Sequence, residues 1–327
     1  MNLPILSVKD LSTDIAIDIG VVRAVKNVGF DLYPGQTLGI VGESGCGKSM
    51  LCKSILRLIP KNGTILETSR IIFNGQTLNT LSENELNKIR GQDISMIFQD
   101  PMSSLNPVMK IGEQIVESLI YHQRIKEEPA FKKTLDLLES VGIPNPDQRF
   151  HQYPHQLSGG LRQRVAITIA LACEPKILIA DEPTTALDVT VQAEILDLLA
   201  DFQIQKNMAI LLVTHDFGVA ASRAHEIAVM YAGRIVEYAP ALELLTNSRM
   251  PYTKALIDSI PRLEDPPHTL LNSINGHPPN LITPYTGCCF APRCSYATSQ
   301  CRKKEPLLKS DNNNQHFYAC WNPLGNI

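Results

Sequence analysis

The 327-residue sequence has little excess charge of either sign, no long apolar run and no basic N-terminal region. Its formal net charge of -3 gives no electrostatic attraction to nucleic acid, so a basic binding groove is not expected. No stretch approaches the roughly 18 uninterrupted apolar residues that a membrane-spanning helix needs. The start, MNLPILSVKDLSTD, lacks the basic region and apolar core of a secretory signal. Together these absences predict a cytosolic chain.

Cysteine is scarce over most of the sequence and is then concentrated near its end. Three cysteines are scattered, at Cys46, Cys52 and Cys173, whereas Cys288, Cys289, Cys294, Cys301 and Cys320 lie in the last forty residues. Eight cysteines without an export signal favour free thiols or metal ligands over disulfides. With 44% hydrophobic and 19% charged residues the chain is globular, long enough for one large domain plus an appendage or for two medium domains.

Apolar runs alternate with segments of helical spacing, which predicts a parallel α/β sheet. Near-continuous apolar runs, typical of strands covered on both faces, occupy residues 36–41, 176–181 and 209–215. Helical spacing predicts helices over 49–59, 83–90, 131–143 and 190–205, and a mostly helical region from about 105 to 157. Beyond about residue 245 the sequence predicts a short helix at 251–261 and then an irregular, proline-rich stretch over 264–287. No internal repeat is present.

The stretch GESGCGKS, residues 42–49, fits the pattern G-x-x-x-x-G-K-[ST] between a predicted strand and a predicted helix. In such a loop the backbone N–H groups and the helix dipole bind phosphates, Lys48 reaches the β and γ positions, and Ser49 ligates magnesium. The alternative is a glycine-rich turn, which the strand–loop–helix context disfavours. The residues predicted to contact nucleotide here are Gly42, Glu43, Ser44, Gly45, Cys46, Gly47, Lys48, Ser49 and Met50.

Two further motifs have residues suited to a phosphate site: one supplies two carboxylates, and the other supplies backbone N–H groups at a helix N-terminus. ILIADEP ends a predicted strand with Asp181 and Glu182, which could be a helix cap or a solvated turn. After a phosphate loop the pair is better explained by Asp181 holding magnesium indirectly and Glu182 acting as general base. LSGGLRQR offers Ser158, Gly159 and Gly160 at a helix N-terminus able to face an anion, with a simple N-cap as the alternative.

The ordered set of motifs resembles that of an ABC-transporter ATPase. The set consists of the phosphate loop, Gln99 after a strand, LSGGLRQR, ILIADEP, ALD at 186–188 and TH ending at His215. The resemblance implies an α/β ABC-type P-loop ATPase domain over 1–245, with a parallel sheet core, a helical subdomain at about 100–165 and a small antiparallel β subdomain. A helix and linker over 246–287 and a cysteine-rich extension over 288–327 follow.

The same resemblance implies that two ATPase subunits sandwich two ATP molecules head to tail. Ser158 and Gly160, with Gly159, then touch the γ-phosphate held by the opposite subunit. Gln99 senses the γ-phosphate and magnesium, and Asp188 links the two sites. His215 positions water and γ-phosphate, although a strand-end histidine without a catalytic role is the alternative. The sequence departs from the family pattern at Ile15, which stands about where an aromatic residue usually stacks on adenine.

The spacing Cys288-x5-Cys294-x6-Cys301-x18-Cys320, with Cys289 as a spare neighbour, leaves zinc and iron–sulfur ligation equally open, and reduced thiols on a tail as a third reading. The stretches YAGRIVEYAP, PYTKALIDSIP and GCCFAPRCSYATSQC resemble the ATPase subunits of bacterial dipeptide and oligopeptide permeases. That resemblance implies a [4Fe-4S] cluster on the four cysteines, with Zn²⁺ as the alternative, and a short tail stabilised by metal binding.

The resemblance further implies a Mg²⁺-dependent ATPase at the cytoplasmic face of the inner membrane that powers uptake of di- and oligopeptides. The expected partners are a second, distinct ATPase subunit, two transmembrane permease subunits that contact the region from 99–107 onward, and an extracytoplasmic substrate-binding protein, with no nucleic acid. Nickel and antimicrobial-peptide importers are alternatives for the cargo. A non-transport ABC protein and an ATP sensor without turnover are disfavoured by the single ATPase set and by intact Lys48, Asp181, Glu182 and His215.

Overall fold

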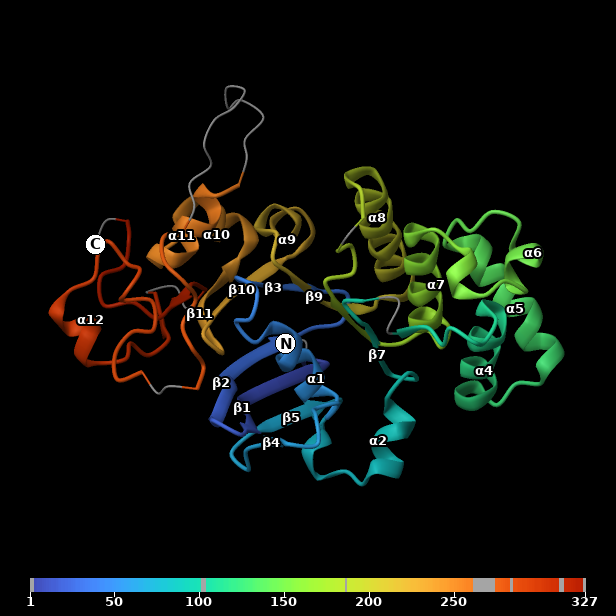
Figure 1. The fold of residues 1–327 in the computed structure, drawn as a ribbon, viewed down its shortest axis with the longest axis horizontal. Helices are drawn as coiled ribbons and strands as arrows, with labels where there is room; N and C mark the ends of the chain where they lie inside the picture. The colour runs from blue at the N-terminus through green and yellow to red at the C-terminus, as the bar shows by residue number, and fades with distance from the viewer. Residues whose placement is uncertain are drawn as a thin grey trace. The chain divides into compact units, whose positions relative to one another are not determined.

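The computed structural model describes residues 3–100, 104–185, 187–260, 274–282, 285–311 and 315–325. The chain divides into two compact units (Figure 1). The first unit comprises Met1–Leu32, Thr37–Asn79 and Leu212–Ile327, and the second comprises Tyr33–Gln36 and Thr80–Leu211. The first unit is therefore assembled from segments far apart in the sequence.

The N-terminal strands of the first unit form an antiparallel sheet, drawn in blue in Figure 1. A long hairpin joins β1 (Leu6–Ile17) to β2 (Gly20–Leu32), with Leu6 opposite Leu32. The strand order is β2-β1-β5-β6, and β4 also pairs with β1. The remaining strands are β4 (Gly63–Ile65), β5 (Arg70–Phe73) and β6 (Gln76–Thr77). The small antiparallel β subdomain predicted from the sequence is confirmed.

A second group of paired strands in the first unit carries the phosphate-loop segment. Strand β3 (Thr37–Val41) is buried throughout and pairs in parallel with β10 (Glu226–Tyr231). Strand β11 (Arg234–Pro240) runs antiparallel to β10, and β13 (Phe317–Tyr318) and β12 (Lys309–Ser310) continue the row. Its helices are α1 (Lys48–Ile55), α9 (Phe217–Arg223), α10 (Ala241–Asn247), α11 (Pro251–Asp258) and α12 (Ser299–Lys303).

Helix α1 is shorter than the sequence predicts. The apolar spacing predicts a helix to residue 59, before Pro60, but the helix ends at Ile55. Arg57 has a φ of 53°, in the left-handed region that a right-handed helix excludes. The turn at Arg57, and not the proline, therefore ends the helix.

The second unit combines parallel strands with a cluster of helices. Strand β7 (Ile94–Ile97) pairs in parallel with β8 (Ile177–Asp181), so that Ile94 lies beside Ile177. Two elements contain residues of both units: β9 (Ala209–Thr214), in which the first unit resumes at Leu212, and η1 (Leu78–Thr80), in which the second unit resumes at Thr80. The helices are α2 (Glu83–Ile89), α4 (Ile111–Gln123), α5 (Glu127–Ser140), α6 (Pro146–Phe150), η2 (Pro154–Gln156), α7 (Gly159–Leu171) and α8 (Val189–Lys206).

The helices between β7 and β8, drawn in teal to green in Figure 1, share a core of their own. Ile111, Ile115 and Leu119 of α4 pack with Leu138 of α5 and Val165 of α7, and all five are fully buried. The four-residue spacing of Ile111, Ile115 and Leu119 places them on one face of α4, as an amphipathic helix requires. The largely helical region predicted from about 105 to 157 is therefore present as α4, α5 and α6.

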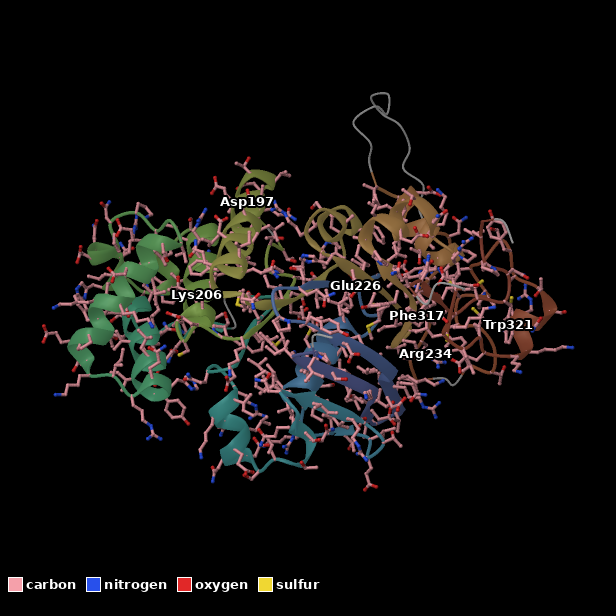
Figure 2. The ribbon with its side chains drawn as sticks, turned by 180° about the vertical axis from the view of Figure 1, so that it is seen from behind. Asp197, Lys206, Glu226, Arg234, Phe317 and Trp321 are labelled. Carbon is pink, nitrogen blue, oxygen red and sulfur yellow. The ribbon has the colours of Figure 1, made fainter. Side chains whose placement is uncertain are left out.

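The cysteine-rich extension packs into the core of the first unit. Phe290 and Cys320 are buried in the same cluster as Tyr231 and Tyr252, and Cys288, Cys289 and Cys294 pack against that cluster. Phe317, labelled in Figure 2, lies opposite Tyr238 in the pairing of β13 with β11. The Trp321 indole N–H donates to the Lys304 carbonyl at 2.8 Å. Of the proline-rich stretch 264–287, residues 264–273 and 283–284 lie outside the described residues.

Within the part of the chain that the structure describes, no helix has the length and apolar character needed to cross a membrane.

Candidate nucleotide-binding site

The loop Gly42–Ser49 connects β3 to α1, as the motif predicts, and its path depends on glycine at two positions. Gly47 has a φ of +108°, and a Cβ there would lie 2.2 Å from the Ala24 carbonyl oxygen. A Cβ on Gly42 would lie 2.2 Å from the Met230 carbonyl oxygen. Because both carbonyls belong to the backbone, a larger residue could fit only by displacing the loop.

Lys48 lies over this loop and is 4% exposed. Its ammonium donates to the carbonyl oxygens of Gly42 at 2.8 Å and Glu43 at 3.1 Å. Lys48 is also the first residue of α1, whose N-terminal dipole favours an anion at the same place. The loop thus combines a buried ammonium with a helix N-terminus, the combination that binds phosphate. Ser49 and Met50 follow in the first turn of α1.

Cys46 has a structural position within the loop. Its side chain is 5% exposed, and burial raises the pKa of its thiol. Its N–H donates to the Glu43 carbonyl at 3.3 Å, and its own carbonyl accepts from the Gly233 N–H at 2.8 Å. Gly45, with a φ of +78°, has open space where a Cβ would be, so its backbone conformation and not crowding favours glycine.

The second unit brings Glu182 and Gln99 together. Glu182 directly follows β8, is 8% exposed and has a φ of 49°. Its carboxylate accepts from Gln99 Nε2 at 3.0 Å and from Thr185 Oγ1 at 2.9 Å. A non-glycine residue in the left-handed region is strained, and such residues concentrate at functional sites. The two donors fix the direction in which this carboxylate points.

Asp181, the last residue of β8, is 1% exposed. A buried carboxylate requires a hydrogen-bonding partner or a cation. Burial of Asp181 is therefore compatible with its predicted place at a magnesium site. The sequence therefore located both acidic residues correctly at the strand end. Of the ALD stretch at 186–188, residue 186 lies outside the described residues.

Ser158 begins α7 as its N-cap, with its hydroxyl accepting from the Leu161 N–H at 3.4 Å. Ser158 and Gly159 are exposed, and Gly160 is half-buried. A Cβ added to Gly160 would lie 3.1 Å from a methyl carbon of Val191, which is a tight contact. The helix thus has both a capping hydroxyl and accessible glycine backbone at its N-terminus. Asp188 caps α8 in the same way, accepting from the Val191 N–H at 3.0 Å.

His215 follows β9 and is exposed, and Asp216 next to it caps α9 by accepting from the Val219 N–H at 3.1 Å. His215 belongs to the first unit with Lys48 and Ser49. Gln99, Ser158, Asp181, Glu182 and Asp188 belong to the second. Ile15, the residue in the position expected for an adenine-stacking aromatic, is half-buried on β1.

The four predicted cysteine ligands line one small cavity, with Phe290 and Trp321 also in its wall. The described residues contain no group of three or more His, Cys, Asp or Glu side chains placed to hold a metal ion. Burial raises the pKa of Cys288 to about 11 and that of Cys320 to about 12. Cys289 does not line this cavity and instead faces Arg234 and Lys26. Burial raises the pKa of the Cys289 thiol, and these two cations partly oppose that rise. Cys289 is therefore not equivalent to its neighbour.

Sequence reasoning missed two contacts to the phosphate loop and a third that holds one of the contacting side chains. Arg293 forms an ion pair with Glu43, and the Glu43 N–H donates to the Tyr252 hydroxyl at 3.0 Å. Arg293 also donates to the Tyr231 hydroxyl at 3.3 Å. The only sequence signal for Arg293 was its position directly before Cys294. No local pattern links Arg293 to a loop so far away in the sequence.

Solved structures and family models agree with this geometry. Residues 25–185 match the protein-family model described as ABC transporter, and residues 236–301 match the one described as Oligopeptide/dipeptide transporter, C-terminal region. The dimeric ATP-binding cassette MJ0796 in a post-hydrolysis state, bound to ADP and Pi, gives a TM-score of 0.65 at 29% identity, covering 72% of this chain and 98% of that one. The cassette cbiO1 from Clostridium perfringens gives 0.63 at 26% identity, covering 76% and 92%. The fold and the site define an ATP-binding cassette ATPase.

Curated relatives extend over almost the whole chain. The dipeptide transport ATP-binding protein DppD of Bacillus subtilis is 47% identical, over 97% of this chain and 94% of that protein. The oligopeptide transport ATP-binding protein OppD of Escherichia coli is 45% identical, over 98% and 94%. This chain belongs to the family of ABC-transporter ATP-binding proteins that contains DppD and OppD.

Proposed function

We propose that the chain is the ATP-hydrolysing subunit of an ABC importer of di- and oligopeptides. Its partners are a second, distinct ATP-binding subunit, two transmembrane permease subunits and an extracytoplasmic substrate-binding protein, and it works at the cytoplasmic face of the membrane. The observation that carries the proposal is the Glu182 carboxylate aimed by Gln99 and Thr185 in a chain that also has the peptide-transporter C-terminal region. The names of the relatives support peptides as the cargo.

In this proposal Glu182 is the general base that takes a proton from the attacking water. Its two donors, Gln99 and Thr185, both bind Oε2 and so fix the direction of the carboxylate. Lys48 binds the β- and γ-phosphates, and the loop's N–H groups bind the rest of the phosphate chain. The residues predicted to hold Mg²⁺ are Ser49, Gln99 and Asp181, and a bound Mg²⁺ would neutralise phosphate charge. His215 positions the water and the γ-phosphate.

The site is completed by the other ATP-binding subunit. Ser158, Gly159 and Gly160 offer a capped helix N-terminus that is exposed at Ser158 and Gly159, so they are accessible to a nucleotide held by the partner subunit. Asp188, at the N-terminus of α8, links the two sites across the interface. Hydrolysis then requires closure of the pair, which couples it to movement of the permease subunits.

Reconstitution of the complete importer in liposomes tests the proposal. We expect di- and oligopeptides, delivered by the binding protein, to stimulate ATP hydrolysis and to accumulate inside. Lys48→Ala removes the phosphate-binding ammonium and is expected to abolish both, whereas Lys61→Ala, at an exposed position after α1, leaves both unchanged. Stimulation by nickel in place of peptide would identify the alternative cargo and overturn the peptide assignment.

We also propose that Cys288, Cys294, Cys301 and Cys320 hold a [4Fe-4S] cluster. Four thiols around one cavity match the donor set of such a cluster. A single zinc ion requires all four sulfurs at about 2.3 Å from one point. The four thiols suit either group, and the match to the peptide-transporter C-terminal region supports the cluster over zinc. When bound, the cluster supplies a covalent link between distant parts of the extension.

Iron and acid-labile sulfide content, measured on protein purified without oxygen, tests this second proposal. Wild type and Cys289→Ser are expected to carry equal amounts of both, because Cys289 lies outside the cavity. Cys294→Ser is expected to lose most of the metal and to unfold at a lower temperature. One zinc ion per chain without sulfide would replace the cluster by a structural zinc site, and metal content unaffected by Cys294→Ser would exclude that residue as a ligand.

A further inference from the structure

Arg293, in the cysteine-rich extension, forms an ion pair with Glu43 of the phosphate loop. Its two terminal nitrogens donate to the two carboxylate oxygens of Glu43, at 2.6 and 2.8 Å. This two-point pairing is the geometry in which a guanidinium binds a carboxylate most strongly. The Arg293 side chain is 5% exposed and that of Glu43 is 22% exposed, so the pair is largely shielded from solvent. The hydrogen bonds to Glu43 are the main cause that raises the pKa of Arg293, which stays charged.

The guanidinium is fixed on its other sides as well. Nε donates to the Asn275 carbonyl at 2.9 Å, and a terminal nitrogen donates to the Ile274 carbonyl at 3.2 Å. Its central carbon lies 5.9 Å from the ring centres of Tyr231 and Phe290. An arginine held by so many partners has little freedom to follow a moving carboxylate. Arg293 therefore sets the position of Glu43, and not the reverse.

Glu43 is in turn connected to the lysine of the loop. Its carbonyl accepts from the Lys48 ammonium, and its N–H donates to the Tyr252 hydroxyl. Glu43 is the second residue of a loop whose proposed ligand is a polyanion. A carboxylate there repels phosphate unless a cation neutralises it, and at separations of a few ångströms this repulsion is substantial outside bulk water. Arg293 is the cation that pairs with Glu43.

We propose that Arg293 is a positioning residue of the nucleotide site, which neutralises the Glu43 carboxylate and holds it in place so that the loop accepts phosphate. Nucleotide affinity thereby depends on the folded cysteine-rich extension, since Arg293 lies directly before Cys294. The inference rests on the proposed phosphate-binding role of the loop. A purely structural pair makes a different prediction, because it alters stability but leaves the nucleotide affinity of the folded protein unchanged.

Calorimetric titration of the full-length chain with ATP and Mg²⁺ separates these cases. Arg293→Gln leaves the Glu43 charge unpaired and is expected to raise the Kd for ATP about tenfold. Adding Glu43→Gln to that variant removes the charge, and we expect the Kd of the double variant to return to within about threefold of wild type. Arg302→Ala, an exposed arginine of the same extension, is the matched control and leaves the Kd unchanged.

In the reconstituted importer the expected effect of Arg293→Gln is a raised KM for ATP with kcat nearly unchanged, as for a loss of binding that is equal in ground and transition states. An unchanged Kd in folded Arg293→Gln, or no recovery in the double variant, overturns the proposal. Should Arg293→Gln fail to fold, Glu43→Gln alone remains decisive, because a Kd raised threefold or more by that variant contradicts a repulsive carboxylate. Lys48→Ala with wild-type affinity would instead overturn the phosphate-loop assignment itself.

Discussion

At the scale of single residues, Glu182, the proposed general base, has a side chain of defined orientation. Its backbone has a positive φ, and its carboxylate is held by one amide and one hydroxyl donor. Both donors lie in the same unit as Glu182, so the arrangement is complete within that unit. A general base oriented before the substrate arrives needs no reorganisation during proton transfer.

Replacing Glu182 with Gln removes the base while keeping the side-chain shape. We expect ATP binding to persist and turnover by the assembled importer to fall about 10²-fold or more, as for the loss of a general base. Release of phosphate, measured beside equilibrium binding of ATP, checks both parts. Asp201→Asn, at an exposed position on α8, is the control and retains wild-type turnover. Undiminished hydrolysis by Glu182→Gln would remove Glu182 from the role of base.

The residues that sequence predicted well are those whose chemistry is local. The phosphate loop, the acidic pair after β8 and the cap of α7 each lie within one strand–loop–helix or loop–helix segment, so their spacing carried the information. The pair Arg293–Glu43 was not predictable, because 250 positions separate its members. The end of α1 was also missed, since a left-handed turn at Arg57 leaves no pattern as clear as that of Pro60.

At the scale of elements, strand β11 anchors the C-terminal segment through a buried carboxylate. Glu237 is fully buried and accepts the backbone N–H groups of Arg249 at 2.5 Å and Met250 at 3.1 Å. His316 Nε2 lies 2.7 Å from the same carboxylate, and the next residues form β13 on β11. One side chain thus joins a strand, the start of α11 and the C-terminal segment.

Replacing His316 with Ala removes one partner of this buried carboxylate. The free energy of unfolding is expected to fall by about 1–3 kcal/mol, because a buried acceptor is left with fewer hydrogen bonds. Urea denaturation measures the change, and the exposed His277→Ala is the matched control with no expected effect. A loss as small as that of the control would mean that the two backbone donors satisfy Glu237 without His316.

At the scale of the whole molecule, each of the two units carries its own set of predicted site residues. Lys48, Ser49 and His215 belong to the first unit, and Gln99, Asp181 and Glu182 belong to the second. In the proposed function, Ser158 of this chain serves the nucleotide held by its partner. We therefore expect this chain alone to bind ATP and hydrolysis to require the assembled pair.

A bulky residue at Ser158 tests this division. Ser158→Arg is expected to leave ATP binding by this chain intact and to abolish hydrolysis at the nucleotide held by the partner subunit. Nucleotide binding by the purified variant and hydrolysis by the reconstituted importer give the two readouts. The control, Ser140→Arg at the exposed end of α5, leaves both intact. Loss of binding by the isolated variant would place Ser158 at this chain's own nucleotide.

The discontinuity of the first unit has a consequence for synthesis on the ribosome. Residues 80–211 form most of the second unit as one continuous stretch, whereas the first unit needs residues from the beginning, the middle and the end of the chain. The helical cluster can fold as soon as it emerges, but β11 gains its neighbour β13 only after residues 317–318 have been made. The phosphate loop likewise gains its ion pair only after Arg293 has been made. The proposed nucleotide site of a newly made chain therefore acquires its full support only after the cysteine-rich extension has emerged.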